Sequence, residues 1–341
     1  MRQFLASRWF LIALAVLLFA GFAWPRQLAP YQEYWPQSLV VATVLFLMAL
    51  PLDAGAMWRA LRRPGAVLLA VAINLGLLPL VAWPVAEWLG GIDPGLGNGL
   101  LIAASVPTTL ASAAVWTRRA GGNDSVALLV TMITNLVCFV VTPLWLRWTT
   151  GQNPNLPTDK MIFQLGVVCV LPVACAQLLR LWGPLGQWAG RRKMALGAIS
   201  QCGILSIVLV GAISAGKEIA RQPGAGATTG VPLWGWIAML ASVVAVHLAM
   251  LTAGHLLGRV FGIPRQDRIA VGFAGSQKTQ MVGLYLANAY GGLAVLPMLA
   301  YHVSQLLVDT LIADRLARTS KALAIRAATS AEEPAVIADA G

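Results

Sequence analysis

A lysine and four other polar residues interrupt an otherwise apolar stretch, 269–289, in the segment 275–280 (GSQKTQ). A charge near the centre of a bilayer costs roughly 2.5–3.5 kcal/mol on insertion scales, so it persists where it faces a cavity, a partner or a substrate path. The ammonium of Lys278 could attract an anion, or it could take the place of a bound cation among hydroxyl and carbonyl oxygens. A side chain that snorkels to the membrane surface has to lie near a span end, whereas Lys278 lies about ten residues from each end of its run.

Polar residues also interrupt the apolar run 98–117, around Pro107. Proline removes a backbone donor and blocks the preceding helical turn, and Gly275 in the other run tolerates unwound backbone. Irregular backbone at membrane depth is tolerated only beside a cavity. We therefore expect a binding site lined by the polar side chains of both breaks, namely Thr108, Thr109, Ser112, Ser276, Gln277 and Thr279. The alternative is an ordinary proline kink with polar contacts between helices.

The elements that must position these residues are membrane-spanning helices. The chain has 341 residues, of which 58% are hydrophobic and only 11% charged, with a mean hydropathy of +0.73. Soluble domains carry about 25% charged residues. At roughly 20 residues per span, the length accommodates ten helices and no large soluble domain. The predicted spans are 9–25, 37–57, 65–89, 98–117, 125–147, 161–181, 195–215, 233–257, 269–289 and 293–313.

The first run also has the layout of a signal peptide, because Arg2 and Arg8 precede an apolar core that ends in small residues. Trp24 and Pro25 directly afterwards disfavour cleavage. We expect a retained first helix, since its removal would leave an odd number of helices.

Basic residues are distributed unequally between the two sets of loops. With the N-terminus in the cytoplasm, 18 of the 24 lysines and arginines lie inside and five outside, and Lys278 alone lies within a span. This asymmetry is the positive-inside pattern, so both termini are predicted to be cytoplasmic. The net charge of +11 follows from this orientation and does not indicate binding to nucleic acid, because the charges are scattered through short loops.

Residues 1–320 form one predicted transporter domain, and the segment 321–341 is rich in Ala, Thr and Ser with little apolar periodicity. We expect a disordered cytoplasmic tail there. Ten helices divide into two sets of five, and an odd-numbered repeat in tandem takes opposite orientations in the membrane. The fourth and ninth helices then correspond, and both are interrupted. Corresponding interruptions in two halves are typical of the binding site of a secondary transporter.

Several segments resemble the bile acid:sodium symporter (BASS) superfamily, in particular its SBF-like branch. They are 107–117 (PTTLASAAVWT), 120–123 (AGGN), 141–144 (VTPL), 275–279 (GSQKT) and 50–53 (LPLD). The resemblance implies a panel domain of helices 1, 2, 6 and 7, and a core domain of helices 3–5 and 8–10 in which helices 4 and 9 unwind and cross. It also implies import of organic anions with sodium, and core-site positions at Asn74, Ser112, Thr131 and Gln277.

The chain departs from the sodium-coupled pattern at two points. Where sodium-coupled members have a Ser-Asn pair at the first break, this chain has Ser112 and Ala113, and it has no Asp or Glu from 269 to 308. Sodium sites use several oxygen ligands, usually with an anionic one among them. These departures argue against classical coupling to two sodium ions, and we expect Lys278 to replace one of them. A proton-coupled or uncoupled carrier, or an exporter of the same fold, is the alternative.

The tenth run carries His302, Gln305 and Asp309 at i, i+3 and i+7, which aligns them on one helix face. This face could bring a carboxylate and an imidazole to the core site. In the other interpretation, Asp309 lies near the cytoplasmic end and pairs with a basic side chain. His247 and His255, eight residues apart in the eighth run, are more typical of packing residues than of a proton relay.

An enzyme within the membrane is the competing class of protein. It would need a nucleophile with a base, paired carboxylates or a metal set. The sequence contains no His-Glu-x-x-His, no Gly-x-Ser-x-Gly and no Cys/His ligand cluster, which leaves a Ser276–Lys278 dyad as the only conceivable machinery. A channel is the third class, distinguished from a carrier by throughput that is limited only by diffusion.

The sequence therefore predicts an all-α, ten-helix secondary transporter of the cell inner (cytoplasmic) membrane. Its expected partners are membrane lipid and a small organic anion, without nucleic acid, resident metal or soluble cofactor. No signature of an oligomeric state is present.

Overall fold

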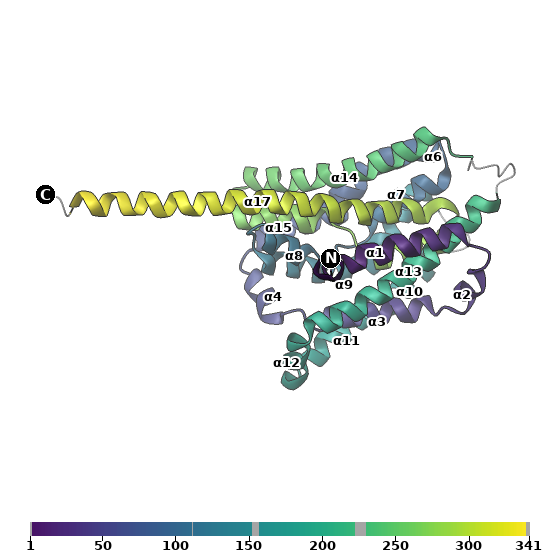
Figure 1. Ribbon diagram of the computed structural model, residues 1–341, viewed down its shortest axis with the longest axis horizontal. Coiled ribbons are helices and arrows are strands. Elements are labelled where there is room, and N and C mark those ends of the chain that lie inside the picture. The colour runs from purple at the N-terminus through teal and green to yellow at the C-terminus, as the bar shows by residue number, and fades with distance from the viewer. Residues whose placement is uncertain (1, 111, 152–156, 222–229, 339–341) are drawn as a thin grey trace.

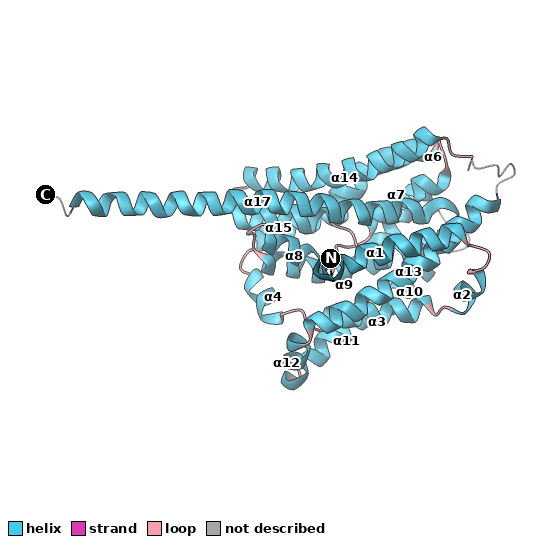
Figure 2. Ribbon diagram, in the orientation of Figure 1, coloured by secondary structure: helices cyan, strands magenta, loops and turns pink. Residues whose placement is uncertain are grey.

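Helices make up every regular element in the described part of the chain (Figure 2). The structure is a computed structural model that describes all residues except 1, 111, 152–156, 222–229 and 339–341. Within this part, six helical stretches are long and apolar enough to cross a membrane: Pro64–Gly90, Asp124–Thr150, Thr158–Arg180, Lys193–Lys217, Leu233–Val260 and Gly292–Thr319. The all-helical prediction is thus confirmed for the described residues.

Each of the ten predicted spans contains all or part of at least one helix of the structure. The first half of the chain has α1 (Arg2–Ala23), α2 (Ala29–Tyr34), α3 (Gln37–Ala49), α4 (Ala54–Ala60), α5 (Pro64–Ala72), the π-helix η1 (Ile73–Leu77), α6 (Leu78–Gly90), α7 (Pro94–Ser105), α8 (Ser112–Arg119) and α9 (Asp124–Thr150). The second half has α10 (Thr158–Leu165), the π-helix η2 (Gly166–Val170), α11 (Leu171–Arg180), α12 (Gly183–Arg191), α13 (Lys193–Arg221), α14 (Leu233–Val260), α15 (Arg265–Ser276), α16 (Gln280–Tyr290), the 3-10 turn η3 (Gly292–Ala294) and α17 (Val295–Ala338).

The second predicted span, 37–57, is shorter in the structure. Helix α3 ends at Ala49, just before Pro51, which cannot donate to the helical ladder. Asp53 then starts the separate helix α4, because its side chain accepts a hydrogen bond from the Gly55 N–H at 2.9 Å. An acidic N-cap of this kind satisfies a backbone donor that a helix start leaves free.

The helices pack side by side in a bundle (Figure 1). Helix α13 lies against α1 and α3, and α3 lies against α11. Helix α14 packs on α15 and α17, α6 on α7, and α15 on α5, while α13 also packs on α16. Glycines allow close approach between helices: a Cβ on Gly21 would lie 2.5 Å from the Cβ of Ala212, and one on Gly97 would lie 2.5 Å from the Ala86 carbonyl oxygen. Small residues of this kind are typical of helix contacts in membranes.

Helix α17 runs well past the tenth predicted span and extends beyond the bundle (Figure 1). It continues to Ala338, through most of the segment 321–341 that we expected to be disordered; residues 339–341 lie outside the described part. Alanine, leucine, arginine, lysine and glutamate fill much of this segment, and these are the strongest helix formers. Low apolar periodicity therefore did not indicate irregular backbone.

Candidate functional site

The two interrupted helices meet at their breaks. Helix α7 ends at Ser105 and α15 ends at Ser276, and α8 and α16 resume the two helices after the breaks. The Thr279 N–H donates to the Pro107 carbonyl oxygen at 2.8 Å. Because α7 packs on α16 and α8 packs on α15, the first half of each broken helix contacts the second half of the other. This is the contact pattern of two helices that cross where they unwind.

Gln277 ties the second break to the first. Its Oε1 accepts hydrogen bonds from the Thr109 Oγ1 and Ser112 Oγ hydroxyls at 2.9 Å each, and the two hydroxyls also contact each other. Gln277 is fully buried, so these bonds replace water. The predicted residues Pro107, Ser112, Gln277 and Thr279 therefore converge on one place.

In the π-helix η1, the carbonyl oxygens of Asn74 and Leu75 lack their usual backbone donors. The Leu78 N–H bonds to the Ile73 carbonyl oxygen rather than to that of Asn74, and Pro79, the next residue, has no N–H to offer. The residue that would normally donate to the Leu75 carbonyl oxygen is the same proline, which has no N–H. This oxygen therefore accepts a hydrogen bond from Trp145 Nε1, at 2.7 Å. The Asn74 carbonyl thus stays open toward the core of the bundle.

The Asn74 side chain holds the end of α15. Its Nδ2 lies 3.2 Å from the carbonyl oxygens of Ala274 and Gly275 and 3.0 Å from that of Gln277. These carbonyls have no helical partner, because α15 stops at Ser276. The predicted site position Asn74 therefore binds backbone at the second break.

Lys278 is fully buried, and its ammonium lies between two carbonyls that irregular backbone has freed. Nζ donates to the Asn74 oxygen at 2.6 Å and to the Val106 oxygen at 2.8 Å. Val106 follows the last residue of α7, so its carbonyl belongs to the first break. Gln305 fixes the lysine backbone, since its Oε1 accepts from the Lys278 N–H at 2.9 Å and its Nε2 donates to the Lys278 oxygen at 3.0 Å.

Side chains of helix α9 donate hydrogen bonds to backbone carbonyl oxygens at the first break. Thr131 Oγ1 donates to the Thr109 oxygen at 3.3 Å, and Asn135 Nδ2 donates to the Thr108 oxygen at 2.9 Å. Thr142 Oγ1 donates to the Ser105 oxygen at 2.8 Å. The predicted residues Thr108 and Thr131 thus belong to the break, with Thr108 contributing its carbonyl.

Asp309 lies in the interior of the bundle, not at its surface. It is fully buried, accepts a hydrogen bond from Gln277 Nε2, and lies 2.8 Å from His247 Nε2. The interpretation in which Asp309 pairs with a basic residue at the membrane surface is therefore wrong. His302 is also buried, and its Nδ1 accepts from Gln305 Nε2 at 3.0 Å, which places the proton of the neutral ring on Nε2.

Ser276 contributes its backbone to this region. Its carbonyl oxygen accepts from the Tyr301 hydroxyl at 3.0 Å and lies 3.3 Å from His247 Nδ1. Its own hydroxyl donates to the Phe273 oxygen within α15, at 3.5 Å.

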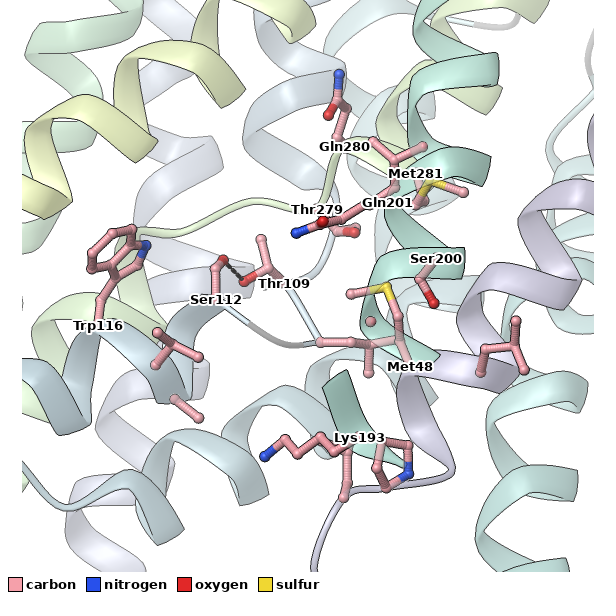
Figure 3. Close-up of a pocket in the computed structure, with 18 of the residues that line it drawn as sticks. Met48, Thr109, Ser112, Trp116, Lys193, Ser200, Gln201, Thr279, Gln280 and Met281 are labelled. Carbon is pink, nitrogen blue, oxygen red and sulfur yellow. Dashed lines mark hydrogen bonds between the residues drawn. The ribbon is translucent and has the colours of Figure 1, made fainter. Parts of the chain in front are cut away.

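A cavity of about 470 Å³ adjoins the crossing. Its walls are mostly apolar, and its polar lining includes Thr109, Ser112, Thr279, Gln280, His302 and Lys193. Figure 3 shows Thr109 and Ser112 facing each other on one wall, with Gln280 directed away from them and Lys193 toward the other end. The residues at the crossing can thus be reached from an apolar cavity that admits one small solute.

Four residues of the site were not predicted as such: Tyr301, Asn135, Gln305 and His247. Asn135 lies one turn from Thr131, and Gln305 lies one turn from His302, so helical spacing from the predicted residues was the available signal. For His247, only its apolar surroundings were visible, and these favoured packing.

The crossing of two broken helices beside a cavity defines a membrane transport protein, and comparison with known proteins gives its family. Residues 8–318 match the SBF-like CPA transporter family. A relative from Pseudomonas aeruginosa, uncharacterized protein PA2026, is 27% identical over 93% of this chain and 94% of its own. The putative symporter YfeH of Escherichia coli is 26% identical over 75% and 76%. The sodium/bile acid cotransporter 7-B of Xenopus laevis is 24% identical over 90% and 91%.

The chain belongs to the SBF-like CPA transporter family, because the match covers most of its length. The family predicted from the motifs at the two breaks is therefore confirmed. The protein is a multi-pass membrane transporter.

Proposed function

We propose that the protein is a secondary active transporter of a small organic anion across the cytoplasmic membrane, with ten spans in an inverted five-helix repeat. Both termini lie in the cytoplasm, the panel comprises spans 1, 2, 6 and 7, and the core comprises the others. The observation that carries the proposal is the position of Lys278, buried between two freed carbonyls where the broken helices cross. The names of the relatives, which include a symporter and sodium/bile acid cotransporters, support a solute carrier.

The ammonium of Lys278 does here what a bound cation would do. Carbonyl oxygens from a π-helix and from a helix end point at one positive charge, and such oxygens are the ligands that hard cations prefer. The charge also lies at the C-terminal end of α7, where the helix dipole is negative. A lysine tethered to the chain supplies this stabilisation without sodium, so we expect sodium-independent transport.

The cavity supports an anionic substrate with an apolar body. The Nε2–H of His302 is a donor at its wall. The Thr109 and Ser112 hydroxyls donate to Gln277 Oε1 in this structure and can turn to donate to a solute instead. Donors of this kind bind carboxylates or sulfonates. With the N-terminus inside, the end of the cavity near Lys193 faces the cytoplasm, and we infer an inward-open state.

The geometry argues against a Ser276–Lys278 catalytic dyad. The Ser276 hydroxyl donates to Phe273, and the Lys278 ammonium donates to Asn74 and Val106. The two groups are thus bound to different backbone atoms, and the lysine does not act as base to the serine.

Transport in the absence of sodium tests the proposal. Choline salts of monocarboxylates, dicarboxylates, sulfonates and cholate are first screened for a thermal shift of the purified protein, then for uptake into proteoliposomes. We expect saturable uptake and counterflow that persist when sodium is replaced by choline, and loss of uptake in folded Lys278→Gln and Lys278→Ala proteins. Lys160→Gln, at an exposed lysine, is the matched control and should transport normally. Strict sodium dependence, or full activity of either Lys278 variant, would contradict the role of Lys278.

A further inference from the structure

A histidine and an aspartate form a fully buried pair next to Gln277. His247 comes from α14 and Asp309 from α17, and Nε2 lies 2.8 Å from Oδ1 with both side chains 0% exposed. The other carboxylate oxygen accepts a hydrogen bond from Gln277 Nε2. One side chain, Gln277, therefore separates this pair from the Thr109 and Ser112 hydroxyls at the cavity wall.

The contacts of His247 require two protons on the pair. Nδ1 faces the Ser276 carbonyl oxygen at 3.3 Å, and a carbonyl can only accept. Nε2 faces a carboxylate oxygen, while a neutral imidazole has only one N–H. The second proton lies either on Nε2 or on Oδ1, and in both cases the net charge of the pair is zero.

Loss of that second proton disrupts one of the two contacts. If the remaining N–H points to Asp309, a ring lone pair faces the Ser276 oxygen; if it points to Ser276, a ring lone pair faces the carboxylate. The pair also acquires a net negative charge in a buried position, which is costly unless it is compensated. Since Ser276 is the last residue of α15, the protonation state is communicated directly to the second break.

Other titratable groups near the pair are already engaged. On α17, Tyr301 donates to the Ser276 oxygen with its ring centre 5.8 Å from that of His247, and His302 accepts from Gln305. At the second break, the Lys278 ammonium binds carbonyls of Asn74 and Val106.

The remaining groups on the neighbouring helices lie farther along them or pair elsewhere. On α15, Arg265, Asp267 and Arg268 are in the first turn, eight or more residues before Ser276, and Glu87 on α6 is exposed. On α8, Arg118 and Arg119 pair with Asp124 and Asp314. His255 on α14 lies two turns beyond His247.

We propose that the His247–Asp309 pair binds the proton that is transported together with the substrate anion. The proposal rests on the carrier function above and names its coupling ion. An anion at the Thr109 and Ser112 hydroxyls binds more tightly beside a neutral pair than beside a negative one, because like charges repel. By linkage, the bound anion raises the affinity of the pair for its proton equally, so proton and anion move in the same direction.

Nitrogen NMR of histidine in lipid bilayers tests the pair without any substrate. The chain has three histidines, and His247→Gln assigns the signal in protein labelled with ¹⁵N-histidine. We expect both ring nitrogens of His247 to carry or share a proton at low pH, and one proton to leave in a single step as the pH rises. His255→Gln, two turns away on the same helix, should leave that step unchanged.

The Asp309→Asn variant distinguishes proton release by the His247–Asp309 pair from proton release by His247 alone. Asparagine has the shape of a protonated aspartate and can donate to Nε2, so we expect the step of His247 to disappear while the protein stays folded. Potentiometric titration of the two purified proteins should show one proton fewer released by Asp309→Asn over the same pH range. The proposal is overturned if the two ring-nitrogen signals of His247 show no pH-dependent step in the range in which the protein is folded. It is also overturned if the step is unchanged in Asp309→Asn. Because neither measurement involves transport, a failure of the pair is distinguishable from a failure of the proposed carrier function.

Discussion

Gln305 is the side chain on which the position of Lys278 most directly depends, and its removal can be predicted quantitatively. Gln305 is fully buried and bonds both the N–H and the C=O of Lys278, at 2.9 and 3.0 Å. A Gln305→Met substitution keeps the length of the side chain but removes its donor and acceptor. Two backbone groups at the second break are then left without a partner in the interior.

His302 Nδ1 loses the same donor. Each buried group left unsatisfied costs about 1–3 kcal/mol, so with three such groups Gln305→Met should destabilise the protein by about 3–9 kcal/mol. The Lys278 N–H alone accounts for about 1–3 kcal/mol of this. Since 1.4 kcal/mol corresponds to a tenfold change in an equilibrium constant, amide exchange at Lys278 should accelerate by about 5- to 150-fold. Local opening is the better measure here, because a large membrane protein need not unfold in one step.

Hydrogen exchange with mass spectrometry on peptides that cover 277–279 measures this effect. Thr310→Val is the matched control on the same helix, because the Thr310 hydroxyl bonds only the Leu306 carbonyl of its own helix, at 2.6 Å. We expect exchange at the break to change in Gln305→Met and to stay at the wild-type rate in Thr310→Val. Equal exchange rates in the two variants would refute the view that Gln305 holds the break.

Two further predictions concern packing and access. Gly99→Ala should lower stability by about 1–3 kcal/mol, because the new Cβ would lie 2.3 Å from the Ala294 carbonyl oxygen. Gly65→Ala is the control and should not lower stability, because a Cβ there would have nothing within 4 Å. The apparent Tm of the two purified variants measures the difference, and equal Tm values would contradict the close contact. In protein whose native cysteines are replaced, Ser112→Cys should react with a membrane-impermeant maleimide in inside-out vesicles but not in intact cells, because Ser112 lines the cavity. The buried Ser105, which does not line the cavity, should stay unlabelled as cysteine in both preparations, and labelling of Ser112→Cys from outside would contradict an inward-open state.

The two breaks were predictable because their signal is local. Pro107 and Lys278 each stand in an apolar run where neither residue type is tolerated without a reason. The spacing of His302, Gln305 and Asp309, which places them on one helix face, was also a local signal. In the structure Gln305 binds the Lys278 backbone and Asp309 binds Gln277.

The pairing of these residues was not predictable from one sequence. Lys278 binds the carbonyl of Asn74, 204 residues away, and that carbonyl is free only because a π-helix precedes Pro79. A π-helix has the same apolar composition as the α-helix around it, so hydropathy contains no trace of it. His247 was assigned to packing for a similar reason, since its partner Asp309 lies 62 residues further along the chain.

Lys278 and the His247–Asp309 pair have complementary consequences for energy coupling. A sodium ion that holds the crossed helices together can leave on the other side of the membrane, and its gradient then drives transport. The ammonium of Lys278 performs the holding but is attached to the chain, so it returns with the protein in every cycle and contributes no gradient. A carrier built in this way is either uncoupled or draws on a second ion. We assign that exchange to the buried His247–Asp309 pair, and the ion is then a proton.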